Sequence, residues 1–228
     1  MSAATEPAPP LGDADPEDLD AAALVTALVE RFGTGLVLAC SFQKEEAVLL
    51  DMLYAADASA RVFALDTHVL FPETYAYWRS VEERYDTRIE VFEGPSLGRQ
   101  AAEHGADLWE HAPDRCCAIR KVEPLGRALD GRDCWITGVR RDQSPTRATA
   151  PKLGWDAAHG LWKASPLADW DDARTWAYIR DRQLPYNALH DTGYASIGCT
   201  YCTMPGDGRE GRWSGTGKVE CGLHVPLA

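Results

Sequence analysis

The feature that most constrains the fold is an alternation of short apolar runs with segments of helical periodicity. Each run is four to eight residues of mainly apolar side chains bounded by turn residues, which is typical of a buried strand. Strands that alternate with helices predict a mainly parallel twisted sheet with helices on both faces, which is an α/β fold. The four predicted strands are Gly35–Cys40, Arg61–Asp66, Thr87–Gly94 and Asp133–Val139.

The segments between and around these strands carry apolar residues at helical spacing. Asp114 is a suitable N-cap for the segment that contains two adjacent cysteines, and Pro124 is expected to end that helix. Asp169 and Asp172 stand in positions resembling a capping box before the last helix. The predicted helices are Asp18–Phe32, Glu45–Ala56, one starting near Pro72, Ser96–His104, Asp114–Pro124 and Asp169–Gln183.

Polar stretches follow three of the predicted strands. They read "SFQKEE", "DTHVLFPET" and "RRDQSPTR". Because parallel sheets bind ligands at the carboxyl ends of their strands, the three stretches should meet at one edge and form a site there. The first lies where many α/β proteins bind phosphate, but no G-x-x-x-x-G-K-[ST] motif occurs in the chain, so binding of ATP by a Walker loop is not expected.

Charge and composition divide the chain into three parts. Residues 1–20 hold six acids, four prolines and no Lys or Arg, which predicts a disordered acidic arm. Residues 21–205 are expected to form a single α/β domain, and residues 206–228 a mobile tail rich in Gly, Arg and Trp. The net charge of −12 argues against nucleic-acid binding, and half of it lies in the arm. An anionic substrate would therefore need a local basic pocket.

No run of apolar residues is long enough for a membrane helix, and the N-terminus lacks the pattern of a secretion signal. We therefore expect a cytoplasmic protein with no membrane partner, whose seven cysteines are mostly reduced. Cys40 and Cys134 lie at the ends of predicted strands and are expected to be packing residues.

Four cysteines have the pattern of metal ligands. Cys116 and Cys117 are adjacent, and Cys199 and Cys202 form a C-x-x-C pair. Four thiolates suit either zinc or an iron–sulfur cluster. Adjacent cysteines hold one small ion poorly, whereas each could bind its own iron in a cluster, so the spacing favours the cluster and leaves zinc as the alternative.

A further cysteine, Cys221, lies in the Gly-flanked tail. Such a residue contributes little to a core, but it can reach into a site as a nucleophile. His224 and the arginines of "GREGRW", Arg209 and Arg212, are near enough in sequence to favour its thiolate. An incidental exposed thiol is the alternative.

The loops after the first two strands resemble a known family. "SFQKEEAVLLDM" together with "ALDTHVLFPETY" is similar to the sulfonucleotide reductases, which have the adenine-nucleotide α-hydrolase-like fold. The resemblance implies that Ser41 and Phe42 hold the acidic end of a nucleotide. It also implies that Leu65 and Thr67 lie beside the adenosine.

The cysteine motifs resemble one branch of that family. "CCAIRK" with "GCTYC" is similar to the assimilatory adenylyl-sulfate (APS) reductases, which implies a [4Fe–4S] cluster on the four paired cysteines and APS as substrate. "ECGLH" resembles the catalytic tail motif, which implies that Cys221 takes the sulfonate from APS and that thioredoxin then releases sulfite. In the family the lysine at Lys121 lies between cluster and substrate. The other basic residues expected to bind substrate are Arg140, Arg209, Arg212 and His224.

Two other functions remain open from the residues. The first is a reductase specific for the 3′-phosphorylated nucleotide PAPS that happens to carry the four cysteines. The second is a non-catalytic zinc-binding protein in which those cysteines are structural; it leaves Cys221 and the basic loops without a role.

Overall fold

Six strands form one sheet in the order β3-β2-β1-β4-β6-β5, and every neighbouring pair is parallel except β5 with β6. The computed structural model describes residues 7–224, so the first six residues of the expected arm and the last four of the expected tail lie outside it. The expected mainly parallel sheet is confirmed. The strands are β1 Leu36–Cys40, β2 Arg61–Asp66, β3 Glu90–Glu93, β4 Cys134–Ile136, β5 Leu153–Asp156 and β6 Leu161–Ala164.

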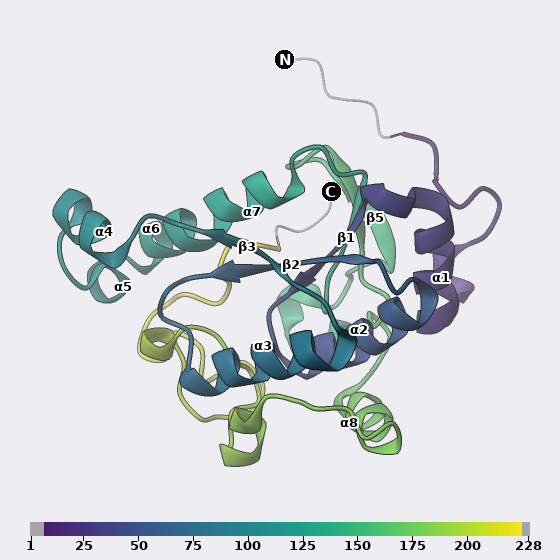
Figure 1. Cartoon of the computed structure of the whole chain (residues 1–228). Coiled ribbons are helices and arrows are strands. Elements are labelled where there is room, and N and C mark those ends of the chain that lie inside the picture. The colour runs from purple at the N-terminus through teal and green to yellow at the C-terminus, as the bar shows by residue number, and fades with distance from the viewer. Residues whose placement is uncertain (1–6, 225–228) are drawn as a thin grey trace.

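Helices cover both faces of the sheet (Figure 1). Leu36 and Leu38 of β1 face a core shared with α1, α2, α3 and α8, whereas Val37 points to the opposite face and joins a core made with α7. This alternation follows from the period of two along a strand. The helices are α1 Ala21–Phe32, α2 Lys44–Ala56, α3 Pro72–Tyr85, α4 Leu97–His104, α5 Leu108–His111, α6 Pro113–Cys117, α7 Glu123–Leu129 and α8 Asp172–Asp181.

The strands β5 and β6 were not predicted. They form an antiparallel hairpin that places β6 beside β4 and leaves β5 at the edge. Each has only four residues, and the turn between them includes Gly160 with a φ of +70°. The alternation of strands with helices did not indicate these two strands, because no α-helix separates β4 from β6. The other predicted elements are present, with most ends shifted by up to three residues.

The helical segment that contains the adjacent cysteines does not end at Pro124. α6 continues into a π-helical turn, Ala118–Val122, and then directly into α7. Pro124 is the second residue of α7 and closely follows the π-helical turn, and the helical path continues past it. Asp114 is likewise not the N-cap, because α6 already begins at Pro113. The N-cap of α8 is Asp171, whose side chain accepts from the Arg174 amide, rather than Asp169 or Asp172.

The acidic arm is packed on the domain from about residue 10 onward, which differs from the expected disorder. The Glu17 carboxylate forms an ion pair with Arg141 at 2.7 Å, and the Lys152 ammonium donates to the carbonyls of Glu17 and Leu19. Leu11 and Leu19 pack against the main core. The acids of this segment are therefore partly neutralised by the domain, which explains why it does not behave as a solvated charged arm.

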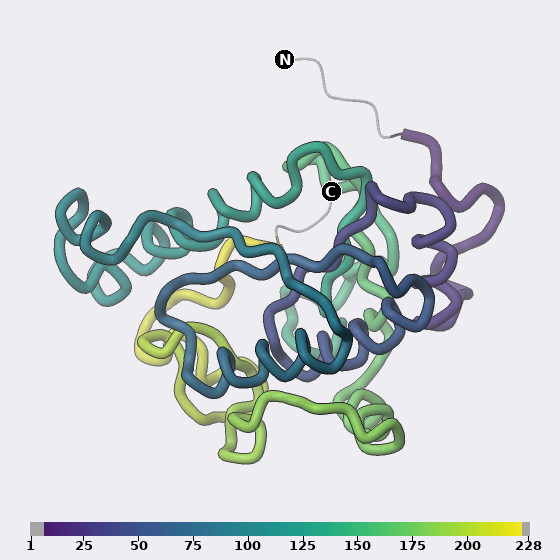
Figure 2. The backbone as a smooth tube through the Cα atoms, viewed as in Figure 1, coloured from purple at the N-terminus to yellow at the C-terminus, as the bar shows by residue number. Residues whose placement is uncertain are grey.

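After α8 the chain forms short 3₁₀ turns and loops and returns to the sheet, where its yellow end passes close to β2 (Figure 2). Leu223 packs against the core on the α7 side of the sheet. The irregular C-terminal segment is thus folded against the domain in this structure, and its mobility stays a prediction. Over residues 7–224, no helix is both long and apolar enough to span a membrane.

Candidate active site

A cavity opens at the carboxyl edge of the sheet, where the loops after β1, β2 and β4 meet the C-terminal segment. This is the edge at which the sequence placed the site. Most of the predicted binding residues line this cavity together with the predicted nucleophile. They are Ser41, Phe42, Leu65, Thr67, Lys121, Arg209, Arg212, Cys221 and His224.

The loop after β1 is held by a buried carboxyl group that the sequence analysis did not single out. Glu46 Oε2 accepts hydrogen bonds from the Ser41 hydroxyl at 2.8 Å and from the Gln43 amide at 3.1 Å. Burial, together with the charge of Glu45, raises the pKa of Glu46 to about 8. Glu46 is therefore mainly neutral near pH 7 and does not repel an anion in the cavity. In the sequence, the adjacent Glu45 and Glu46 at the start of a predicted helix were the feature that could have indicated this carboxyl group.

Phe42 has a left-handed backbone, with a φ of +61°, and its ring is buried against Trp78 at a centroid separation of 4.8 Å. The amide of Asn187 donates to the Phe42 carbonyl. The aromatic side chain thus anchors the loop in the core, and the loop's polar atoms face the cavity.

Cys221 is buried in the cavity wall with 7% of its surface exposed. Burial by itself would raise the pKa of its thiol, but the charges of Lys121 and Arg212 and a backbone hydrogen bond outweigh burial, so the pKa lies below its ordinary value. Gly222 follows with a φ of +85°, a conformation that side chains rarely adopt, and turns the chain at the nucleophile. The cationic environment therefore favours the thiolate form of Cys221.

His224 stacks on Trp135, with the ring planes 13° apart. Burial and the neighbouring charges of Lys163 and Arg147 hold the pKa of His224 well below its usual range. Its imidazole is therefore neutral, and it offers the cavity a hydrogen-bonding group rather than a charge. The idea that a charged His224 favours the Cys221 thiolate is not supported by this environment.

Arg140 was predicted to bind substrate, but it does not line the cavity. Its guanidinium donates to Glu45 at 3.0 Å, to Asp142 at 2.5 Å and to Asp172 at 3.0 Å. It is 3% exposed. The arginine of this loop that does line the cavity is Arg147. Sequence alone did not separate the arginines of the loop, because their roles depend on which way each side chain points from irregular backbone.

Replacing Arg140 with glutamine is expected to lower the free energy of unfolding by about 3–5 kcal/mol, because the buried Glu45 carboxylate loses its partner. The matched control is Arg141→Gln, which removes a half-exposed pair with Glu17 and should cost less than about 1 kcal/mol. Urea unfolding followed by circular dichroism measures both. Equal losses in the two variants would contradict the structural role of Arg140.

The four paired cysteines line a second, smaller cavity next to the first. Cys116 and Cys117 come from the end of α6, and Cys199 and Cys202 flank a 3₁₀ turn that is tied to the loop after β2 by a bridge between Leu70 and Cys199. The Cys199 thiol lies 3.3 Å from the Thr67 hydroxyl. Residues far apart in sequence are thus brought to one place, as the motif pairing predicted.

Burial and neighbouring sulfurs disfavour thiolates in this second cavity. Burial, with the charges of Cys117 and Cys199, raises the pKa of Cys116 to about 11, and burial with Cys199 raises that of Cys202 to about 11. The positive charge of Arg120 opposes this rise in the pKa of Cys116. The Arg120 side chain is 1% exposed and donates to the Thr67 carbonyl. Four thiols collected in one place form a donor set that could hold a metal centre once the thiols are deprotonated.

Lys121 is the one residue, within the described range 7–224, that lines both cavities. Burial would lower the pKa of its ammonium, but the sulfurs of Cys199 and Cys221 outweigh burial and raise it. Lys121 therefore stays charged between the four-cysteine cavity and the nucleophile. It lies in the π-helical turn, a type of distortion that is common at functional sites.

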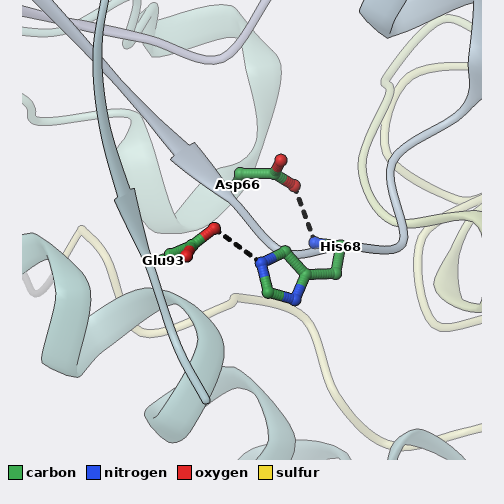
Figure 3. Close-up of side chains that lie close together, drawn as sticks. All are labelled: Asp66, His68 and Glu93. Atoms are coloured by element: carbon green, nitrogen blue, oxygen red, sulfur yellow. Dashed lines mark hydrogen bonds and ion pairs between the residues drawn. The ribbon is translucent and has the colours of Figure 1, made fainter. Parts of the chain in front are cut away.

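Asp66, His68 and Glu93 also come together, at the carboxyl ends of β2 and β3 (Figure 3). Asp66 accepts from the His68 amide and from the Tyr75 hydroxyl, and His68 Nε2 lies 2.7 Å from Glu93 Oε2. These contacts link the three residues to one another and to Tyr75. We interpret the group as a brace that fixes the loop carrying Thr67.

Comparison with known proteins agrees with the arrangement of the site. The adenosine 5′-phosphosulfate reductase of Shouchella clausii is 48% identical over 204 residues, which cover 86% of this chain and 84% of the relative. The phosphoadenosine 5′-phosphosulfate reductase of Gloeobacter violaceus is 47% identical over 218 residues, with coverages of 92% and 90%. Relatives named for APS and for PAPS are therefore about equally similar to this chain.

A crystal structure of a phosphoadenylyl-sulfate reductase from Candida auris, in complex with phosphate, superposes with a TM-score of 0.73 at 30% identity. The match covers 82% of this chain and 92% of the other. Residues 35–205 match the family model described as phosphoadenosine phosphosulfate reductase domain. This range includes the loops after β1, β2 and β4 and all four paired cysteines. The chain belongs to the phosphoadenosine phosphosulfate reductase family.

Proposed function

We propose that this protein reduces APS to sulfite and AMP, with Cys221 as nucleophile and thioredoxin as electron donor. It is an oxidoreductase acting on a sulfur group, as its family relationship indicates. The observation that carries the proposal is the position of the Cys221 thiol. It is buried in the same cavity as the loop after β1 and beside two cations, Lys121 and Arg212, which lower its pKa.

In the first step the Cys221 thiolate attacks the sulfur of the APS sulfate group. A sulfur–sulfur bond forms, the bond between sulfur and the phosphate oxygen breaks, and AMP leaves with the electron pair. The product is a thiosulfonate on Cys221. An anion attacks an anion in this step, so fixed positive charge is needed where negative charge gathers. Lys121 and Arg212 supply it next to the attacking sulfur.

In the second step a thiolate of reduced thioredoxin attacks the Cys221 sulfur and sulfite leaves. A mixed disulfide forms, and the second thiol of the donor resolves it, so that Cys221 returns to the thiol and the donor becomes a disulfide. The dithiol supplies both electrons, and no one-electron carrier is required. This agrees with a supporting rather than a redox role for any metal centre.

We propose that Cys116, Cys117, Cys199 and Cys202 hold a [4Fe–4S] cluster. Four thiolates on one tetrahedral zinc would lie roughly 3.8 Å apart, given Zn–S bonds of about 2.3 Å. Within residues 7–224, no three of these sulfurs lie within 4.8 Å of one another. This arrangement, together with the adjacency of Cys116 and Cys117 in sequence, supports ligands that bind separate irons over a single zinc ion. Such a cluster would supply a fixed negative charge beside Lys121.

APS is proposed as substrate rather than PAPS because the adjacent cysteines and the C-x-x-C pair resemble the APS-specific branch. PAPS differs by one additional phosphate.

Protein purified without air is expected to contain about four irons and four sulfides per chain. It should convert APS to sulfite with a kcat/KM at least about a hundredfold above that for PAPS, since an unpaired extra phosphate is strongly rejected by a buried site. Iron and sulfide analysis and steady-state kinetics with thioredoxin measure the two quantities on one preparation.

Specific outcomes would contradict the expected substrate preference, the expected metal content and the proposed reaction. A preference for PAPS would overturn the substrate assignment and leave the reaction type. One equivalent of zinc without iron or sulfide would overturn the cluster. Absence of sulfite release with both nucleotides, in protein that carries the cluster, would overturn the proposed function.

A further inference from the structure

Glu220, the residue before the nucleophile, is bound from several sides. Its Oε1 accepts from Arg147 Nε at 3.0 Å and from the Thr146 hydroxyl at 3.1 Å. Its Oε2 accepts from a terminal nitrogen of Arg147 at 3.0 Å and from Arg209 at 2.9 Å. Both carboxylate oxygens are therefore used, and the contact with Arg147 is bidentate, which is the strongest geometry for such a pair.

The partners of Glu220 come from two parts of the chain. Thr146 and Arg147 belong to the domain, in the loop that follows β4, and Arg147 is supported there by a 2.6 Å hydrogen bond to Gln143. Arg209 lies in the irregular C-terminal segment and packs over the ring of Trp213. The contact thus connects the end of the chain to the domain across a long separation in sequence.

The electrostatics favour a charged Glu220 in this place. Burial would raise the pKa of its carboxyl, but the hydrogen bonds and charge of Arg147, with the charge of Arg209, hold the pKa below its usual range. In the part of the chain that the structure describes, Glu220 is the one carboxylate paired with either arginine. Removal of Glu220 would leave two largely buried cations facing each other.

The pairing also divides the cations of the cavity into two groups. Arg147 and Arg209 share the single carboxylate of Glu220, whereas Lys121 and Arg212 form no ion pair with a carboxylate among residues 7–224. Arg212 instead donates to the Ser196 hydroxyl and the Ile197 carbonyl, neither of which is charged. The larger uncompensated positive charge of the cavity, that of Lys121 and Arg212, therefore lies beside Cys221.

We propose that Glu220 is a positioning residue that seats Cys221 in the cavity through its pair with Arg147 and Arg209. This inference rests on the proposed function only in taking Cys221 as the nucleophile. The side chains on either side of Glu220 differ sharply: Val219 is 66% exposed and Cys221 is 7% exposed. Glu220 fixes the point at which the chain turns inward, while Leu223 and His224 hold the segment beyond it.

The test is the rate at which iodoacetamide alkylates Cys221 in the full chain without nucleotide, followed by mass spectrometry of the peptide that carries it. In Glu220→Gln the closed segment loses charged hydrogen bonds, so the rate at saturating pH should rise about tenfold. The matched control is Glu210→Gln, which makes the same chemical change at an exposed site in the same segment and should leave the rate unchanged.

The pH profile separates positioning from a simple charge effect. Loss of the Glu220 charge also lowers the pKa of Cys221, because that charge raises it. A charge effect alone would move the midpoint of the profile to lower pH and leave the plateau at wild-type level. Positioning by Glu220 requires a higher plateau.

A double-mutant cycle tests the partner. Arg147→Gln should raise the plateau by a similar factor, and Arg147→Gln with Glu220→Gln should raise it no further than Glu220→Gln alone. If Glu220→Gln does not fold, Arg147→Gln and Arg209→Gln carry the same prediction. A plateau within about twofold of wild type in the folded single variants, or independent effects in the double variant, would overturn the proposal. Because no sulfonucleotide is used, this failure would leave the proposed reaction intact.

Discussion

Replacing Cys221 with serine is expected to lower the rate of sulfite release by at least about a thousandfold while nucleotide binding persists, since a serine hydroxyl is a weak nucleophile at neutral pH. The cations that bind the substrate remain in place in this variant. The measurement is paired: sulfite release under steady-state conditions, and the dissociation constant for AMP by calorimetry. A sulfonate adduct on the Cys221 peptide should form in the wild-type enzyme with APS and be absent from the variant.

The matched control is Cys134→Ser, which makes the same change at a fully buried cysteine of β4. Cys134 lines neither the substrate cavity nor the four-cysteine cavity. This variant should keep more than about half of the activity. Substantial sulfite release by Cys221→Ser, or an adduct on another cysteine, would contradict the proposed mechanism.

The architecture and the place of the site could be predicted from the sequence because they depend on local patterns. Apolar runs such as Leu36–Cys40 and Arg61–Asp66 have the length of strands, and the helical spacing between them forces parallel connections. Parallel strands then bring the polar loops that follow them to one edge. The convergence of Ser41, Thr67 and the loop after β4 on one cavity follows from that topology.

Features that depend on side-chain direction or on tertiary contacts could not be predicted. The hairpin of β5 and β6 consists of four-residue strands whose burial is decided by the neighbouring strand β4. Arg140 and Arg147 belong to one irregular loop, and only the fold shows that the first is paired with Glu45 and that the second faces the cavity. The segment around Glu17 was expected to be disordered by composition, but basic residues of the domain bind it.

Replacing Lys121 with methionine is expected to lower kcat/KM for APS about a hundredfold, with most of the loss in kcat, because one buried donor of positive charge at the reacting atoms is typically worth that much. Methionine fills nearly the same volume without charge. Lys121 also lowers the pKa of the Cys221 thiol. Its removal should therefore raise that pKa, and the midpoint of the alkylation profile of Cys221 should move to higher pH.

Two variants separate the charge of Lys121 from a general effect of lysine removal. Lys121→Arg keeps the charge and should recover part of kcat. Lys218→Met removes a lysine that also lowers the pKa of Cys117, but Lys218 is paired with Asp114 and does not line the substrate cavity. Its kcat/KM should change by less than about threefold, since a pair of this kind contributes little. If Lys121→Met and Lys218→Met behaved alike, the position of Lys121 between the two cavities would have no part in the reaction. A loss confined to Lys121→Met, with the shifted alkylation profile, would place its charge at the attacking sulfur.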